Sequence, residues 1–270
     1  MLLDAVKTIL ITTIIQIAAV FGLFFGLGFI HSIVYRLTSR YFSRVFGWTG
    51  MIVTGVIGTP IHEFSHWLMA KIFRHHIHSV SWFNPDRTSG KLGHVEHSYD
   101  RRSIYQTMGN FFIGASPIIF SSPLLVLLVY IFLPDPESIV YPLTEFPRSF
   151  FEFTYMWQQS FLAAWAQIDS GSWKFWVFIF LSLSIALHMA PSSYDQKTMW
   201  KGFFHIALLM CIVNIMLTFA GIPYTKFLLS QLPLLYTIAW VLVYAIFIST
   251  LFLIISFVLY LIKNSITRRP

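Results

Sequence analysis

Charged residues are scarce in this sequence. Asp, Glu, Lys and Arg together make up 11% of its 270 residues, whereas a soluble domain carries about 25%. Such a chain has too few charges to cover a water-facing surface. Hydrophobic residues make up 56% and the mean hydropathy is +0.69, which excludes a disordered chain because disorder requires low hydrophobicity. The composition is therefore typical of an integral membrane protein.

Cysteine is nearly absent as well. The single Cys211 cannot form an intramolecular disulfide, and its apolar surroundings in the sequence predict a small packed residue. The net charge is +7, but the Lys and Arg residues lie between apolar runs and form no basic stripe. We therefore expect the lipid bilayer, and no nucleic acid, as a partner.

Six apolar runs are long enough to cross a bilayer, which takes about 20 helical residues. They lie at 8–30, 47–72, 108–133, 173–190, 202–220 and 232–262. A further aromatic segment at 150–168 contains one charged residue and favours an interfacial helix. We predict an all-α polytopic membrane protein with about six transmembrane helices. It would form a single integral membrane domain over 1–270, with a core at 47–201 and C-terminal helices at 202–270.

The distribution of Lys and Arg predicts the orientation of the chain. Twelve of them lie on the side of the two termini and of the loops after the second and fourth spans, and six lie on the other side. Cytoplasmic loops carry an excess of these residues, so both termini are predicted to be cytoplasmic. Arg36, Arg40 and Arg44 form a counter-signal on the opposite side.

The longest polar stretch, 74–107, has the pattern of a β-hairpin. Polar and apolar residues alternate over 76–83, turn-forming residues fill 84–90, and 91–99 can return as a second strand. We predict a cytoplasmic hairpin after the second span. Its histidines are interpreted as solvated residues or, alternatively, as ligands of a second metal if the strands pair; they are His75, His76, His78, His94 and His97.

The second apolar run contains the pattern H-E-x-x-H, at His62, Glu63 and His66. Residues four apart share one face of a helix, so the two imidazoles can bind one zinc ion while the glutamate acts as a general base on the metal-bound water. With ten histidines in the chain, about 0.007 such matches are expected by chance. The motif therefore predicts a catalytic zinc site.

The location of Glu63 within a span supports this interpretation. An ionisable group at that depth costs at least about 2.5 kcal/mol unless it is paired, protonated or solvated, and a zinc ion with its water would offset this cost. The alternative is a protonated glutamate between helices, with packed histidines. Gly55, Gly58 and Pro60 precede the motif and predict that the metal-binding helix begins near Pro60.

A catalytic zinc site needs a third protein ligand. The best candidates lie in 188–197, at the predicted cytoplasmic end of the fourth span. Asp195 is the first choice and His188 the second. In the alternative interpretation, Asp195 caps the following helix and His188 bonds a backbone carbonyl. His31 and His205 lie at or within spans and are interpreted as structural.

These features together resemble the site-2 protease family of intramembrane zinc metalloproteases. The resemblance depends on the 62–66 motif, the hairpin-like segment 77–99 and the Pro-then-Asp segment 191–195. It implies that the last segment supplies the third zinc ligand and that the substrates are membrane-anchored proteins. Gln196 follows Asp195 where the family usually has Gly, and His188 stands where the family usually has Asn. These two differences indicate a divergent member of the family.

We therefore expect an intramembrane endopeptidase with one zinc per chain, which hydrolyses a peptide bond in or near a transmembrane segment. The substrate would add as a strand to the hairpin edge, at Ile77, Ser79, Val80, Ser81 and Phe83. A regulatory membrane partner is also expected. The alternatives are a zinc-dependent hydrolase of a lipid or small substrate and a metal transporter, in which the histidines and Asp195 would line a path.

Overall fold

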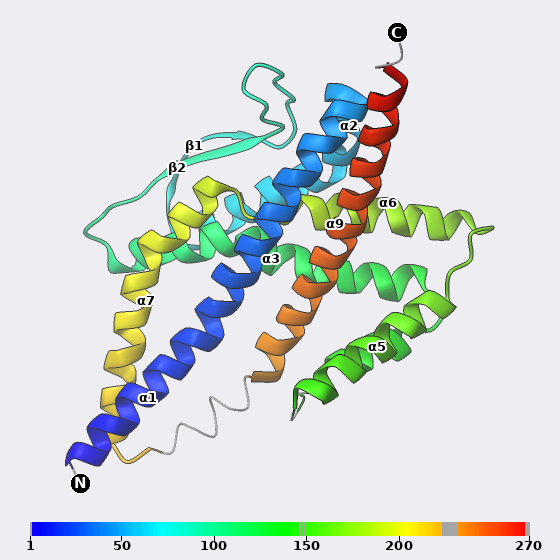
Figure 1. Cartoon of the computed structure of the whole chain (residues 1–270). Coiled ribbons are helices and arrows are strands. Elements are labelled where there is room, and N and C mark those ends of the chain that lie inside the picture. Colours follow the sequence, from blue (N-terminus) through cyan, green and yellow to red (C-terminus); the bar gives the residue numbers. More distant parts are fainter. Residues whose placement is uncertain (1, 146, 148, 223–231, 268–270) are drawn as a thin grey trace.

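The computed structural model describes residues 2–145, 147, 149–222 and 232–267, and it is mostly helical (Figure 1). The elements in chain order are α1 (Leu2–Phe21), the π-helix η1 (Gly22–Leu27), α2 (Gly28–Ile72), β1 (His76–Ser81), β2 (His94–Ser98), α3 (Ile104–Phe132), α4 (Pro136–Val140), the 3₁₀-helix η2 (Tyr141–Leu143), α5 (Phe150–Ala166), α6 (Trp173–His188), α7 (Ser193–Phe219) and α9 (Leu232–Thr267).

Four helical stretches in the described part of the chain are long and apolar enough to cross a membrane. They are Val6–Ile72, Ile104–Phe132, Ser193–Phe219 and Tyr236–Thr267. This supports a membrane protein, but six separate spans are not confirmed. The predicted spans 8–30 and 47–72 both fall in the stretch Val6–Ile72, whose backbone is non-helical at Gly47. Helix α6 has only 16 residues, fewer than the roughly 20 that a bilayer requires.

The orientation of the two termini stays a prediction. Four of the residues counted for it lie outside the described residues, namely Arg148, Lys226, Arg268 and Arg269. Large apolar side chains stand exposed on α1, α7 and α9, as shown by Ile14 (64%), Leu208 (61%) and Ile254 (53%). Exposed apolar surface of this extent is typical of a lipid-facing or partner-facing protein.

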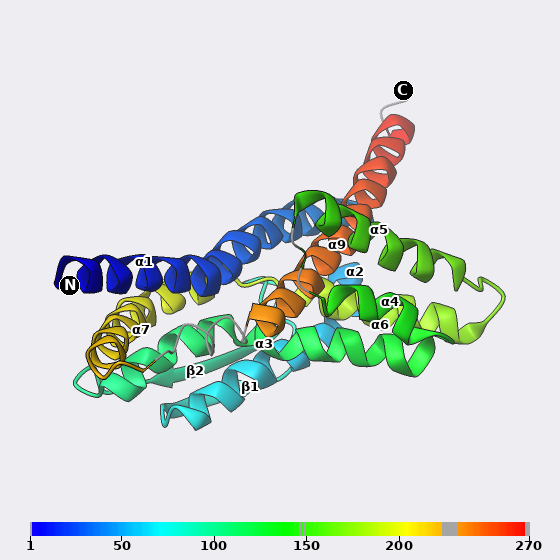
Figure 2. The same cartoon turned by 90° about the horizontal axis from the view of Figure 1, so that it is seen from below.

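Helix α2 turns back on itself at Gly47. This glycine has φ 67° and ψ −159°, a backbone conformation that only glycine adopts without strain. Tyr35 and Thr59 line the same cavity, although 24 residues of straight helix would separate them by about 36 Å. Figure 2 shows the second half of α2 running back. The break therefore lies at Gly47, whereas a start near Pro60 was predicted; Pro60 lies inside the helix.

Close helix packing places α3 at the centre of the fold. It contacts α2, α6 and α7, and Phe111 and Ile118 of α3 are almost completely buried together with Met199 of α7. A Cβ atom on Gly202 of α7 would lie 2.4 Å from the backbone nitrogen of Phe111. The missing side chain therefore allows α7 to lie directly on α3.

The predicted hairpin is present as the antiparallel pair β1 and β2, in which Val80 lies opposite Val95. Beyond the strands, the backbone of Asn84 donates to Leu92, and Asp86 accepts hydrogen bonds from Thr88 and Ser89. These bonds from Ser89 and Thr88 hold the pKa of the Asp86 carboxyl below its usual value. The hairpin tip is therefore a defined turn.

The aromatic segment predicted as an interfacial helix is helical in α5. Several of its aromatic side chains are exposed, including Phe151 (83%) and Trp165 (65%). Its position at a membrane interface stays a prediction.

Cys211 is half-buried within α7 and forms no disulfide, as expected for a single cysteine.

Candidate metal centre

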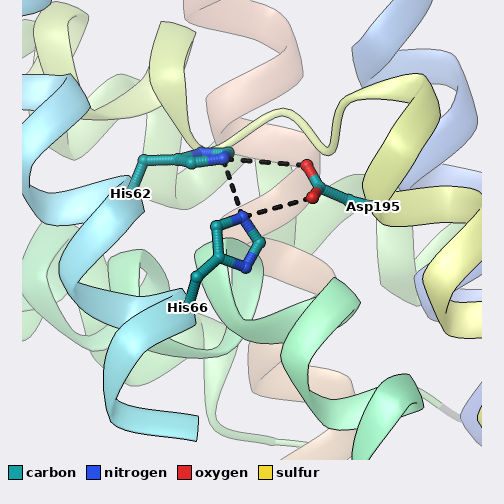
Figure 3. A group of neighbouring side chains, drawn as sticks. All are labelled: His62, His66 and Asp195. Atoms are coloured by element: carbon teal, nitrogen blue, oxygen red, sulfur yellow. Dashed lines mark hydrogen bonds and ion pairs between the residues drawn. The ribbon is translucent and has the colours of Figure 1, made fainter. Parts of the chain in front are cut away.

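Three metal-ligating side chains converge from two helices that are distant in the sequence (Figure 3). His62 and His66 lie one turn apart on α2, and Asp195 lies in the first turn of α7. The two Nε2 atoms are 3.0 Å apart, and the Asp195 carboxylate lies 3.2 Å from Nε2 of His66 and 3.7 Å from Nε2 of His62. This group can hold a metal ion.

Backbone carbonyls fix both imidazole rings. Nδ1 of His62 donates to the carbonyl of His188 at 2.6 Å, and Nδ1 of His66 donates to that of Ile113 at 2.8 Å. A carbonyl oxygen only accepts, so the proton of each ring sits on Nδ1 and the lone pair of each Nε2 faces the other ring and the carboxylate. Metal-bound histidines are usually oriented by such a second bond.

Asp195 has two roles. Its Oδ2 accepts from the backbone nitrogen of Ser192 at 2.7 Å, and Ser192 Oγ accepts from the backbone nitrogen of Asp195 at 3.1 Å. This reciprocal capping box starts α7. The cap that was considered as the alternative to metal binding is therefore real, and the same bonds hold the carboxylate beside the histidines.

The side chain of His188 lies outside this group. Its Nδ1 donates to the carbonyl of Ser184 at 3.0 Å, as the alternative interpretation of this residue predicted, and it is not among the clustered ligands. His188 contributes through its main chain, because its carbonyl orients His62. Of the two candidates, only Asp195 therefore lies in the group that could hold a metal ion.

Two glycines allow these helices to meet. A Cβ on Gly58 of α2 would lie 2.2 Å from the carbonyl of Ser184 in α6, and a Cβ on Gly114 of α3 would lie 2.4 Å from that of Asp195. Any side chain at either position would displace backbone. Gly58 thus brings the end of α6 to His62, and Gly114 brings the start of α7 to the histidines.

Replacing Gly114 with alanine should weaken metal binding about 10- to 100-fold, the range seen when groups that orient ligands are lost. The added methyl would push the first turn of α7, and with it Asp195, away from α2. Competition with a chelating dye on the purified protein measures this affinity. Gly26→Ala is the matched control, because no atom lies within 4 Å of its added Cβ; equal affinities for both variants would contradict the prediction.

Glu63 lies between the metal group and the hairpin. It is 9% exposed and lines a cavity of about 500 Å³ together with His62, His66 and Asp195. A Cβ on Gly93 would lie 2.9 Å from Cγ of Glu63, so the hairpin backbone covers this side chain. A buried carboxyl group that lines a cavity can exchange protons with a molecule in that cavity.

The second strand contributes more residues to the wall of this cavity than the first. Its hairpin wall comes from 91, 93 and 94–97, with His78 from β1. None of the residues predicted to bind substrate is among the lining residues, and all of them lie on or just after β1: Ile77, Ser79, Val80, Ser81 and Phe83. The sequence pattern predicts both strands of the hairpin but does not show which of them lines the cavity. The packing of the hairpin on α2 determines this.

One hairpin histidine is buried, whereas all five hairpin histidines are interpreted from the sequence as solvated residues. His75 is 5% exposed; its Nε2 donates to the carbonyl of Gln106 at 2.8 Å, and its Nδ1 lies 3.0 Å from Nδ1 of His97. The ring also stacks on Tyr99, which explains its burial. Among the described residues, no three hairpin histidines gather into a metal-ligand group.

This histidine pair makes the attachment of the hairpin sensitive to acid. Burial, then the neighbouring His75, lowers the pKa of His97 to about 4, and burial lowers the pKa of His75. An unfolded hairpin would bind these protons near pH 6.5, so the stabilisation is complete above that pH and is lost as the pH falls towards 4.

We expect hydrogen exchange in β2, corrected for the intrinsic rate, to accelerate below pH 6.5 by up to about tenfold per pH unit for each of the two histidines that takes up a proton. The His97→Gln variant should lose the part of this pH dependence that comes from His97, because glutamine does not titrate, and the part that comes from the buried His75 should remain. Exchange in the α3 core is the internal reference. A pH-independent protection of β2 between pH 7 and 5 would show that the pair does not hold the strand.

The two remaining histidines lie away from the metal group. His31 is fully buried, and its Nε2 lies 3.1 Å from Oγ of Ser249, which joins α2 to α9. His205 is half-buried in α7.

Comparison of the chain with protein-family models, with curated proteins and with solved structures finds no match.

Proposed function

We propose that this protein is an intramembrane zinc endopeptidase, which hydrolyses a peptide bond in or near a transmembrane segment of a membrane-anchored substrate. The observation that carries the proposal is the convergence of His62, His66 and Asp195 beside Glu63, within helices whose outer surfaces are apolar. The resemblance of the H-E-x-x-H and Pro-then-Asp segments to site-2 proteases points to the same activity.

The donor set fits zinc. Two imidazole nitrogens and one carboxylate are common ligands of catalytic zinc sites, which leave a fourth position open. Ligands at about 2.1 Å in tetrahedral geometry are separated by about 3.4 Å. Here the two Nε2 atoms lie 3.0 Å apart, Oδ1 of Asp195 lies 3.2 Å from Nε2 of His66, and Oδ2 of Asp195 lies 3.7 Å from Nε2 of His62. We propose one zinc per chain, held by His62, His66 and Asp195.

When bound, zinc would activate water and polarise the scissile carbonyl. Glu63 would accept the proton of the attacking water and then donate it to the leaving amine, since it faces the same cavity as the ligands. The carbonyls of His188 and Ile113 keep the two imidazoles in one tautomer throughout.

A transmembrane helix hides its peptide bonds, so the substrate must unwind before it is cut. An extended segment could pair with an edge of the hairpin through its main chain. Strand β1 is the predicted edge, whereas β2 contributes more of the residues that line the cavity of the metal group. Both strands of this two-stranded sheet are therefore candidate edges.

Proline substitutions test the predicted edge. Proline removes a backbone donor, so Ile77→Pro or Val80→Pro should abolish cleavage while zinc stays bound, if the substrate adds to β1. Ile77→Ala and Val80→Ala should retain most activity, because strand pairing uses the backbone. Cleavage of a membrane substrate at the wild-type rate in both proline variants would exclude β1 and leave β2 as the candidate edge.

The proposed function is tested by co-expression with single-span candidate substrates, followed by mass spectrometry of the fragments. We expect the wild-type protein to cut within or near the span of at least one candidate and Glu63→Gln to leave it intact. Release of fatty acid from lipid vesicles would instead favour the lipid hydrolase. Zinc uptake into vesicles that persists in Glu63→Gln would favour the transporter.

A further inference from the structure

A second cavity reaches Glu63 and has polar atoms that lack partners. It has a volume of about 230 Å³, and its walls come from both halves of α2, the hairpin and the end of α6. Within the described structure, Thr59 Oγ1 and His188 Nε2 have no hydrogen-bond partner, although these residues are only 5% and 8% exposed. Buried polar atoms in native proteins are nearly always paired, so each of these requires an explanation.

The two atoms offer complementary hydrogen bonds. Nδ1 of His188 donates to the carbonyl of Ser184, so Nε2 presents a lone pair and acts as an acceptor. The Thr59 hydroxyl can donate. Both atoms face one place: Thr59 Oγ1 lies 3.2 Å, and His188 Nε2 3.5 Å, from the point where a Cβ on Gly55 would sit.

An apolar side chain now fills this place. Cδ1 of Leu92 lies 2.4 Å from the same point above Gly55, and Leu92 is 8% exposed. A leucine cannot satisfy either polar atom. Leu92 belongs to the hairpin, which also covers Glu63 through Gly93, so a substrate that reaches Glu63 must displace this segment.

We propose that this cavity is a specificity pocket for a carboxamide side chain, Asn or Gln, close to the scissile bond of the substrate. The amide N–H would donate to Nε2 of His188, and the amide oxygen would accept from the hydroxyl of Thr59. An aliphatic side chain would leave both atoms unpaired, as Leu92 does. A carboxylate has no donor for Nε2 and would lie near Glu63.

This inference depends on the proposed peptidase function, and its test uses near-isosteric substrates. Single-span substrates would carry Asn, Asp or Leu in turn at each position flanking the cut, and the fragments would be quantified by mass spectrometry. At one position we expect Asn to be cut at least about tenfold faster than Leu or Asp, because a site built for hydrogen bonds rejects analogues that lack them.

Variants of the pocket should remove this preference. Thr59→Val keeps the shape and should reduce the Asn-to-Leu ratio about three- to tenfold, the value of one neutral hydrogen bond. His188→Phe should act similarly, because the carbonyl that orients His62 is retained. Thr54→Val is the control: Thr54 is also buried in α2, but its hydroxyl bonds the Met51 carbonyl and does not line the cavity.

Capture provides a readout that is independent of cleavage. Glu63→Gln should retain the Asn substrate in preference to the Leu substrate, and Leu92→Ala should raise the cleavage rate of the Asn substrate. Equal cleavage of the Asn and Leu substrates at every position, or an unchanged Asn-to-Leu cleavage ratio in Thr59→Val, would refute the specificity pocket. Neither result would contradict the proposed peptidase function. Failure of the wild-type protein to cut or capture any of these substrates would overturn the proposed function and the pocket with it.

Discussion

Replacing His62 or His66 with alanine is expected to reduce bound zinc in the purified protein from one ion per chain to an undetectable level. Either change leaves two of the three ligands that a catalytic zinc site requires, and the ligands that remain lie on different helices. Elemental analysis after dialysis measures the effect. Cleavage of a membrane substrate should be lost together with the metal.

Glu63→Gln is the matched variant for this experiment. Glutamine has nearly the same shape as glutamate but cannot accept the proton, so zinc content should remain at one per chain while cleavage falls about 10²- to 10⁴-fold, the contribution of a general base. Full zinc content in a protein lacking both histidines would refute the proposed site. Loss of zinc in Glu63→Gln would assign this residue to metal binding instead.

Asp195→Ala is expected to lower zinc content and activity together, because the structure places this carboxylate 3.2 Å from Nε2 of His66. The same change removes the helix cap that Asp195 forms with Ser192. Ser192→Ala separates the two effects, since it loses the capping hydroxyl, at a cost of about 1 kcal/mol of stability, and keeps the ligand. Ser192→Ala should therefore retain its zinc.

His188→Ala completes this comparison of the two candidate ligands. Its side chain lies outside the ligand group, and its carbonyl, which accepts from His62, remains in the variant. We expect zinc content near that of the wild-type protein. The reverse order, with zinc lost in His188→Ala and retained in Asp195→Ala, would require a rearranged site and would exclude the proposed ligand set.

Hydropathy and periodicity predict much of this fold. The apolar runs, the hairpin between 76 and 98 and the helical nature of α5 can all be read from local sequence patterns, because a helix or strand imposes its own period on the residues that it contains. The pairing of His62 with His66 is equally local, since four residues separate neighbours on one helix face.

Other features of the fold depend on backbone conformations and helix contacts that hydropathy does not predict. The break at Gly47 follows from the backbone angles of this one residue, and it separates the helix that contains the predicted span 8–30 from the helix that contains most of 47–72. Glycines near the motif indicated a break close to Pro60, but Gly58 serves the close approach of α6 instead. A glycine in a sequence signals backbone freedom or close packing without specifying which of them is used.

The sequence by itself determined the motif, its glutamate and a short list of third ligands. Only the tertiary structure places Asp195 beside the two histidines and the side chain of His188 outside this group, because their positions depend on how α6 and α7 pack at Gly58 and Gly114. It also selected β2 as the main hairpin wall of the metal cavity and brought Thr59, Leu92 and His188 to one place beside Glu63. Contacts of this kind join residues up to about 130 positions apart, and no local period encodes them.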